Sequence, residues 1–219
     1  MTHAHSRDAS TGGGGIGPAY FDEQAATWDD DPAKVERAAA VAAALAAAVP
    51  LGPDTRVLEY GAGTGLVTQA LRDQLGPVTL ADTSEGMRAV MRSKIEAGIL
   101  PTDARVWSID LATEPPPDEQ FDLIVTVMTL HHIPDLAVVL ERFAMLLTPG
   151  GYLCVVDLDH EDGSFHGEGF GGHHGFHRSE IAEQLRAAGF ASVELADCGE
   201  LVRDGVPYSL FLATARRPG

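Results

Sequence analysis

The sequence is poor in cysteine, in aromatic side chains and in positive charge. Its 219 residues include two cysteines, Cys154 and Cys198, too few for a disulfide framework. One falls on an expected buried strand and the other near a strand end, so we expect reduced thiols and a cytoplasmic location. No apolar run reaches the length of a membrane span. The first residues show no basic-then-apolar pattern typical of a secretory signal.

The shortage of positive charge excludes further classes of partner. Fifteen basic side chains stand against 32 acidic ones, which gives a net charge of −17. Such a surface repels phosphate backbones and anionic membranes. We therefore expect no nucleic acid and no membrane as partner, and a monomer or homodimer. The length favours one domain with a sizeable core.

The chain divides into a tail and a domain. Residues 1–18 are polar and contain four successive glycines at 12–15, so we predict a disordered tail. No strand pattern precedes these glycines, which argues against a phosphate-binding loop. Residues 19–219 form the predicted domain. It begins with an aromatic stretch at 20–29, followed by a helix to about residue 49, with Asp31 as N-cap and Pro32 in the first turn.

The stretch from Arg56 to Gly65 organises the domain. A short apolar run ends in Glu59, three glycines follow at alternate positions, and a helical apolar pattern then begins at Leu66. Glycines at 61, 63 and 65 permit positive φ and let a ligand approach the backbone. This pattern predicts a strand, a tight turn and a helix that together hold a nucleotide-type ligand. Leu66 stands where a dinucleotide fingerprint needs a small residue, and Glu59 suits a cationic or amino group better than a pyrophosphate.

Further strands also end in acidic residues. The run at 77–81 ends in Asp82, 23 residues after Glu59, a spacing that favours a hydrogen bond to ribose hydroxyls, although Asp82 could also cap the following helix. The run at 104–109 ends in Asp110. Apolar runs at 121–126 and 152–156 predict two more strands, with helices between them, and 191–196 with 208–214 predict a final hairpin.

These features together resemble one family. The pattern E-x-G-x-G-x-G, acids at successive strand ends, and the segments L-H-H-I-P-D and L-T-P-G-G resemble the class I S-adenosylmethionine-dependent methyltransferases, in the small-molecule branch that includes the quinone-biosynthesis enzymes. The likeness covers residues 20–216. It implies an α/β fold: one Rossmann-like three-layer sandwich around a mostly parallel seven-stranded sheet with a C-terminal antiparallel hairpin strand.

The resemblance also implies a cofactor and its contacts. S-adenosylmethionine would donate a methyl group to a small-molecule acceptor and leave as S-adenosylhomocysteine. Asp110 would reach the adenine amino group and Leu111 would flank the ring. Tyr20 and Trp28 in the aromatic stretch could lie over the sulfonium or beside the amino acid part of the cofactor, or could only pack as part of a lid. The predicted contacts are Tyr20, Trp28, Glu59, Gly61, Ala62, Gly63, Asp82, Thr83, Met87, Asp110, Leu111 and Val127.

A histidine-rich loop at 159–177 follows the fifth strand and predicts a lid. One of its histidines could be a general base, and we take His131, His173 and His174 as the catalytic candidates. The histidines could instead only cap or face solvent. A metal site from His166, His173, His174 or His177 with Glu168 is the third reading, but the spacing matches no recognised ligand pattern, and we predict no metal. The same alternatives, a general base or a residue without a role in proton transfer, apply to His131 and to the adjacent His132.

Two other classes of function fit parts of the pattern. A nicotinamide-dependent oxidoreductase would share the fold but needs a small residue in place of Leu66. A non-catalytic module could bind S-adenosylmethionine, or a metal in the histidine loop, and transfer nothing.

Overall fold

The structure is a computed structural model that describes residues 17–219. Its elements follow in chain order: α1 (Pro18–Gln24), the 3₁₀ helix η1 (Ala25–Asp30), α2 (Pro32–Ala48), β1 (Val57–Tyr60), α3 (Leu66–Leu71), β2 (Val78–Ala81), α4 (Glu85–Glu96), β3 (Arg105–Trp107), β4 (Phe121–Val127), the 3₁₀ helix η2 (Leu130–His132), α5 (Leu136–Leu146), β5 (Leu147–Leu158), α6 (Arg178–Ala187), β6 (Ala191–Arg203) and β7 (Val206–Arg216).

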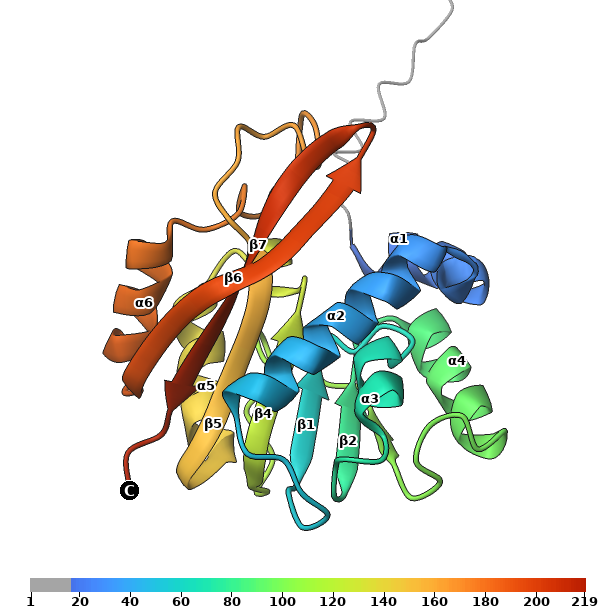
Figure 1. The fold of residues 1–219 in the computed structure, drawn as a ribbon, viewed down its shortest axis with the longest axis vertical. Helices are drawn as coiled ribbons and strands as arrows, with labels where there is room; N and C mark the ends of the chain where they lie inside the picture. Colours follow the sequence, from blue (N-terminus) through green and yellow to red (C-terminus); the bar gives the residue numbers. More distant parts are fainter. Residues whose placement is uncertain (1–16) are drawn as a thin grey trace, which may run out of the picture.

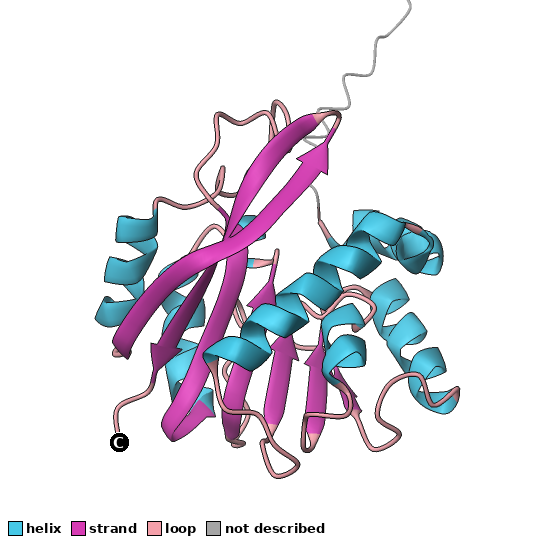
Figure 2. Cartoon of the chain, viewed as in Figure 1, coloured by secondary structure: helices cyan, strands magenta, loops and turns pink. Residues whose placement is uncertain are grey.

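The seven strands form one sheet in the order β3-β2-β1-β4-β5-β7-β6. The first five pair in parallel. Strand β7 is antiparallel to both β5 and β6 and so inserts between them. Figure 2 shows the long β6–β7 hairpin rising beyond the rest of the sheet. The strand order reverses between β1 and β4, and ligands of open α/β sheets bind at the carboxyl ends of strands at such a point.

Helices cover both faces of the sheet (Figure 1). Side chains alternate between the faces along each strand. On one face, Val57 of β1 packs in a core with residues of α2, α3 and α4, such as Leu45 and Met91. On the other, Leu58 packs with residues of α5 and α6, such as Phe143 and Leu185. The predicted three-layer sandwich with a mostly parallel seven-stranded sheet is confirmed.

Element boundaries differ from the sequence patterns where pairing extends a strand. Strand β5 begins at Leu147 because that residue pairs with Phe121 across a register shift, so α5 ends at Leu146 and residues 148–151 lie in the strand. The hairpin is longer than the apolar runs at 191–196 and 208–214 because β6 and β7 pair out to Arg203 and Val206 through two register shifts. Backbone pairing of largely exposed residues leaves little apolar signal.

The N-terminal part follows the expected pattern with two changes. Asp31 caps α2 by accepting a hydrogen bond from the Ala33 N–H at 3.0 Å. Within this helix Val35 is 40% exposed, whereas Ala38, Val41 and Leu45 are buried. Helix α1 begins at Pro18, the last residue of the predicted tail. The remainder of that tail prediction, at 1–16, lies outside the described residues.

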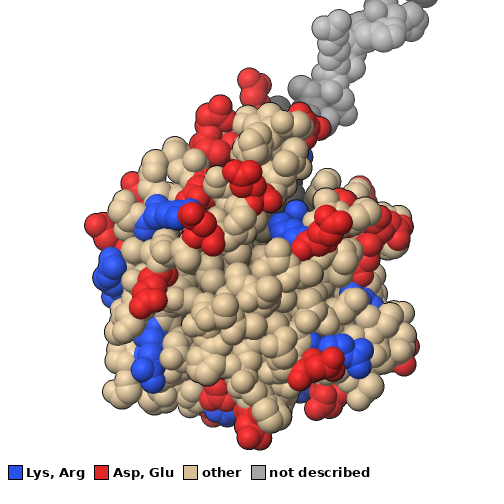
Figure 3. All heavy atoms as spheres, in the orientation of Figure 1, with Lys and Arg blue, Asp and Glu red and all other residues tan. Residues whose placement is uncertain are grey.

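The surface in Figure 3 carries acidic side chains around its upper part, over the hairpin and α1, and is hollowed between them. Within 17–219, no helix is long and apolar enough to cross a membrane.

Candidate functional site

A cavity of about 900 Å³ opens at the carboxyl ends of the parallel strands. Its floor is the glycine turn after β1 and the loops after β2, β3 and β4. The segment α1–η1 and the first turns of α2 form one wall. Phe165 and His166 from the 159–177 loop, with residues 201–203 at the end of β6, contribute the rest of the lining. One cavity thus joins the predicted cofactor end to the histidine-rich end.

The glycine turn needs its glycines. Gly61, Gly63 and Gly65 have φ of 69°, 57° and 78°, a left-handed region that side chains rarely adopt. A Cβ on Gly61 would lie 2.2 Å from the Thr129 Oγ1, whereas one on Gly63 would meet nothing within 4 Å. The turn therefore packs tightly against the loop after β4 and leaves its second glycine open for a ligand.

Glu59 is buried beneath this turn and lines the cavity. Its Oε2 accepts hydrogen bonds from the N–H and the hydroxyl of Thr68, in helix α3. Burial raises the pKa of Glu59 to about 7, and the two bonds from Thr68 oppose that rise. The carboxyl group thus fastens α3 to β1, and a cationic ligand beside it would favour its charged form.

Asp82 holds the two adjoining turns. Its Oδ2 accepts a hydrogen bond from the Gly63 N–H at 2.8 Å, and its Oδ1 accepts one from the Ser84 N–H at 2.9 Å. Burial raises the pKa of Asp82, and these two donors oppose the effect. The N-cap of α4 is Ser84, whose hydroxyl accepts from the Met87 N–H. The alternative reading of Asp82 as that cap is therefore wrong, and its carboxylate lines the cavity.

The third acid, Asp110, also lines the cavity. Its side chain closes a turn, with Oδ1 accepting from the Ala112 N–H at 2.9 Å and Oδ2 from the Thr113 hydroxyl at 3.0 Å. The Leu111 N–H donates to the Tyr60 hydroxyl at 3.0 Å, which ties this turn to β1.

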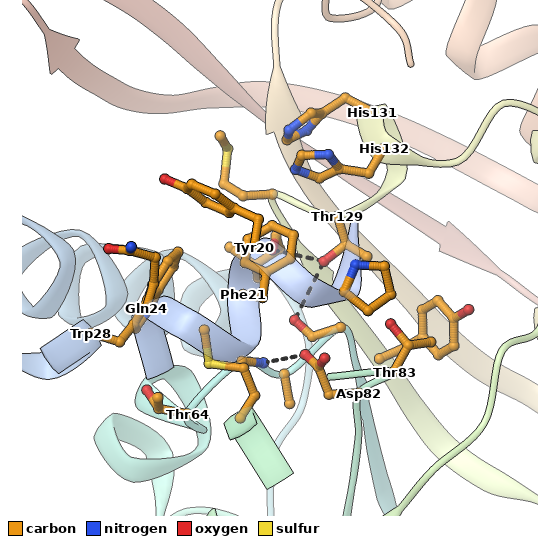
Figure 4. A pocket seen from close by; sticks show the side chains of 18 of the residues that line it. Tyr20, Phe21, Gln24, Trp28, Thr64, Asp82, Thr83, Thr129, His131 and His132 are labelled. Carbon is orange, nitrogen blue, oxygen red and sulfur yellow. Dashed lines mark hydrogen bonds between the residues drawn. The ribbon is translucent and has the colours of Figure 1, made fainter. Parts of the chain in front are cut away.

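The N-terminal segment is fastened over the cavity by two acidic side chains. Asp22 accepts from the Ser84 hydroxyl at 2.6 Å and from the Gly86 N–H at 2.8 Å. Asp29 accepts from the Thr64 hydroxyl at 2.5 Å and pairs with the Lys94 Nζ at 2.8 Å. Figure 4 shows Tyr20, Phe21, Gln24 and Trp28 between the His131–His132 pair and the side chains of Thr64 and Asp82.

His131 and His132 lie side by side at the other end of the cavity (Figure 4), with ring centroids 4.1 Å apart. They follow Met128, whose φ of 54° is strained for a non-glycine residue. The His131 Nδ1 lies 2.6 Å from Oδ1 of Asp157, a fully buried carboxylate at the end of β5. In the neutral ring this contact places the proton on Nδ1 and leaves Nε2 as an acceptor.

His166 joins this pair from the 159–177 loop, with its ring centroid 5.0 Å from His131 and 5.1 Å from His132. Burial lowers the pKa of His132 to about 3 and that of His166 to about 4, with neighbouring His131 adding to both shifts. Both imidazoles are therefore neutral at pH 7 and have lone pairs available.

The 159–177 loop folds back on itself over the cavity. Its two ends pair through the His160 N–H to the Phe176 carbonyl and the Glu161 N–H to the His174 carbonyl. The loop then rests on η2, since the His173 N–H donates to the His131 carbonyl at 2.7 Å.

His173 and His174, two of the catalytic candidates, do not line the cavity. The His173 Nε2 lies 3.0 Å from the Ile133 carbonyl, which engages this ring in holding the loop. The His174 side chain is 40% exposed, and its Nδ1 lies 3.3 Å from Oε1 of Glu161. Only His131 of the three catalytic candidates reaches the cavity.

Most of the predicted cofactor contacts do line it. They are Tyr20, Trp28, Glu59, Gly61, Ala62, Gly63, Asp82, Thr83, Met87, Asp110 and Val127. Leu111 does not, because its side chain is fully buried in the α5–α6 core, and Ile109 and Ala112 line the cavity in its place. A strand end alone does not reveal which of two successive side chains faces the ligand.

Sequence reasoning missed three features of the site. Asp157 ends β5 as Glu59 ends β1, and that shared position was the available signal for its role. From the sequence, His166 is a metal-ligand candidate only together with other residues of its own loop, whereas in the structure its ring packs against His131 and His132. The anchoring of α1–η1 by Asp22 and Asp29 has no local signal because their partners lie far along the chain.

A glycine turn and acids at successive strand ends, placed where the strand order reverses, define a Rossmann-like domain built for a nucleoside-containing cofactor. A family model described as "Methyltransferase domain" matches residues 33–195, more than half of the chain. The chain therefore belongs to the S-adenosylmethionine-dependent methyltransferase family, as its motifs predicted, and S-adenosylmethionine is the cofactor of that family. The nicotinamide oxidoreductase alternative is thereby set aside.

Known proteins agree with this assignment. The chain is 39% identical over 114 residues to a ubiquinone biosynthesis O-methyltransferase of Xylella fastidiosa, a match that covers 51% of this chain and 44% of that protein. Its fold matches the methyltransferase in a complex with the Haloferax volcanii activator Trm112 at a TM-score of 0.73 and 21% identity, over 91% of this chain and 98% of that one.

A second solved structure is phosphoethanolamine N-methyltransferase 2 of Haemonchus contortus, in complex with phosphomonomethylethanolamine and S-adenosylhomocysteine. It matches at a TM-score of 0.69 and 16% identity, over 81% of this chain and 52% of that one. At such identities the likeness shows the fold alone. The matched regions span 30% to 54% of the lengths of the first curated relatives.

Proposed function

We propose that this protein transfers a methyl group from S-adenosylmethionine to a small-molecule acceptor by in-line displacement. The observation that carries the proposal is the single cavity of about 900 Å³ between the glycine turn and the histidine pair. Pockets for one ligand commonly measure about 300–1,000 Å³. A cavity at the upper end of that range supports a donor and a small acceptor side by side.

The residues present suit the donor. Asp82 would accept hydrogen bonds from the ribose hydroxyls, Asp110 lies where the adenine would end, and Glu59 would face the amino group of the methionine part. The open space over Gly63 supports close approach of the donor to the backbone. The sulfonium already activates the methyl group, so these side chains act mainly by holding the donor in line with the acceptor.

The cavity lining holds five acidic side chains, Asp31, Glu59, Asp82, Asp110 and Glu114, and also three basic ones that could pair with an acidic group of the acceptor. The chain has a net charge of −17, yet three of its 15 basic residues, Lys34, Arg37 and Arg203, line this cavity. Burial lowers the pKa of Arg37, which indicates a partly desolvated guanidinium. An anionic group on the acceptor would compensate that desolvation.

The acceptor would lie beside His131. The Nε2 of His131 could act there in two ways: it could take a proton from the methyl acceptor, or it could coordinate a cation. The unpartnered nitrogens of His132 and His166 favour the second. The names of relatives such as the ubiquinone biosynthesis O-methyltransferase support a small organic acceptor.

The test has two stages. Calorimetry with S-adenosylhomocysteine measures donor-site binding, and a coupled assay for S-adenosylhomocysteine release then screens phenols, thiols, amines and carboxylic acids, with acidic members first. The exposed substitution Asp73→Ala is the control for handling and folding. We expect donor binding and release of S-adenosylhomocysteine with at least one acceptor.

The absence of any heat or rise in melting temperature with S-adenosylhomocysteine would overturn the proposal. Tight donor binding without turnover on the whole panel would instead support the non-catalytic module.

A further inference from the structure

Three histidines from two separate loops meet at the acceptor end of the cavity. His131 and His132 belong to η2 after β4, and His166 belongs to the loop after β5. One ring nitrogen from each lies within 4.8 Å of the other two. His131 is 1% exposed, and all three residues line the cavity.

The nitrogens of this cluster lack protein partners. Eight buried side-chain atoms of the described residues have no hydrogen-bond partner, and four of them are His131 Nε2, His132 Nδ1 and both ring nitrogens of His166. A buried polar atom without a partner is costly, and such atoms are few in folded proteins. Their concentration at one point of a cavity indicates a missing ligand that accepts lone pairs.

The best-buried histidine is held as a metal ligand would be. Asp157 contacts the His131 Nδ1 at 2.6 Å and also accepts from the His131 N–H at 3.3 Å. A carboxylate that binds one imidazole nitrogen fixes the ring and raises the basicity of the other, and this arrangement commonly supports histidine ligands of zinc. The Nε2 of His131 is thereby oriented towards the cavity before any ion binds.

We propose that His131, His132 and His166 bind one divalent transition-metal ion of the zinc type, with a further coordination position open to the cavity. Three imidazoles suit zinc, cobalt, nickel or copper better than magnesium or calcium, which prefer oxygen ligands. Nitrogen ligands on a tetrahedral zinc stand about 3.3 Å apart, as follows from bond lengths of about 2.0–2.1 Å. The cluster therefore has to contract slightly, and His166 can move because its ring makes aromatic contacts but no hydrogen bond, and stacks on Phe170 at 3.8 Å.

The other histidines of the 159–177 loop are engaged elsewhere. His173 lies against the Ile133 carbonyl, the His174 Nδ1 faces the Glu161 carboxylate at 3.3 Å without a hydrogen bond, and the rings of His160 and His177 contact each other with centroids 4.0 Å apart. The site thus differs from the loop-only metal site considered from the sequence, because two of its ligands come from η2. A role for the ion in binding the oxygen, nitrogen or sulfur of the acceptor rests on the proposed methyl transfer, whereas metal binding itself does not.

The experiment uses the full chain after treatment with a chelator. Cobalt(II) titration followed by visible absorbance reports nitrogen ligation, and competition with a chromophoric chelator gives the zinc affinity. We compare the wild-type protein with His132→Ala and His166→Ala, and with His160→Ala as the matched control from the same loop. Histidines at positions 3 and 5 are common to every variant, so any binding by them cancels in the comparison.

We expect one cobalt ion per chain at this cluster, with its visible bands lost in both ligand variants and kept in His160→Ala. The zinc affinity should fall at least tenfold in His132→Ala and His166→Ala. The variant Asp157→Asn should weaken zinc binding by about 10- to 100-fold, as loss of such supporting carboxylates does in zinc proteins. Circular dichroism and melting temperature identify any variant that fails to fold. Because His166 lies on a loop, we expect His166→Ala to fold, so the test can be read from this variant even if the others do not fold.

Two results would overturn the metal site: no ion bound above the contribution shared by all variants, or equal affinity in His166→Ala and His160→Ala. Calorimetry with S-adenosylhomocysteine on the same proteins separates this failure from that of the proposed function. Metal binding without donor binding would refute methyl transfer alone, and donor binding without metal binding would refute the metal site alone.

Discussion

Replacing Asp82 by alanine tests the donor site most directly. In the structure this carboxylate accepts hydrogen bonds from the Gly63 and Ser84 N–H groups and still lines the cavity. The substitution removes the proposed acceptor of the ribose hydroxyls. It also leaves two backbone donors without their partner, so some loss of stability is expected with it.

The size of the effect follows from the number of bonds lost. A hydrogen bond to a charged group contributes about 1.5–3 kcal/mol. Because about 1.4 kcal/mol corresponds to a tenfold change in affinity, loss of one such bond weakens donor binding by roughly 10- to 150-fold. We therefore expect at least a tenfold increase in the Kd for S-adenosylhomocysteine in Asp82→Ala.

Calorimetry at a temperature well below the melting transition measures that Kd. Ser84→Ala is the comparison variant, because it removes the N-cap of α4 and the bond to Asp22 without removing the Asp82 carboxylate, and so measures how much loosening this turn and α1 weakens binding. Repeating both titrations with the 2′-deoxy analogue of the ligand isolates the contact with ribose, since the penalty of Asp82→Ala should shrink when a hydroxyl is already absent. An affinity within about threefold of wild type in folded Asp82→Ala would refute the ribose assignment.

Two further predictions concern the glycine turn and the acid beneath it. Because the pKa of Glu59 rises from 4.5 to about 7 on folding, the contribution of this group to stability should fall as pH rises between those values, by up to about 3 kcal/mol. The lowered pKa values of His132 and His166 give a slope of the opposite sign, so the prediction concerns the difference between proteins. In urea unfolding at pH 4.5 to 8, the stability of Glu59→Gln relative to wild type should rise with pH by that amount, while exposed Glu183→Gln keeps the wild-type profile; parallel profiles for Glu59→Gln and wild type would contradict the buried-acid account. Gly61→Ala should destabilise the protein by about 1–3 kcal/mol more than Gly98→Ala, because both glycines have φ of 69° but only the first Cβ would collide with Thr129; equal thermal shifts would show that the close approach costs nothing.

The sequence predicted the sheet because its signals are local. Each parallel strand is a continuous apolar run, and the positions of Glu59, Asp82 and Asp110 after such runs place them at one edge of the sheet wherever the helices lie. The family and the cofactor were implied instead by the resemblance of the glycine turn, the acids and the L-H-H-I-P-D and L-T-P-G-G segments to a known family. The number of strands was also predictable, although the ends of β5, β6 and β7 were not, because pairing with a neighbour extends them beyond the apolar pattern.

The details of the site depended on long-range contacts. Whether Leu111 or Ile109 faces the cavity depends on how the chain turns after its strand. In the structure Leu111 is buried in the core and Ile109 lines the cavity. The histidine loop offered several equivalent candidates in sequence. Closure of that loop over η2 brought His166 into the cavity and used His173 to hold the loop in place.

The sequence by itself determined the architecture, the glycine turn and the row of acids at one edge of the sheet, since periodicity and strand ends are properties of neighbouring residues. Tertiary structure alone decided which histidines face the acceptor end, that Asp157 holds His131, and that Asp22 and Asp29 fasten the first helices over the cavity. Those contacts join residues 26 to 62 positions apart, and packing of the whole domain has to bring such residues together.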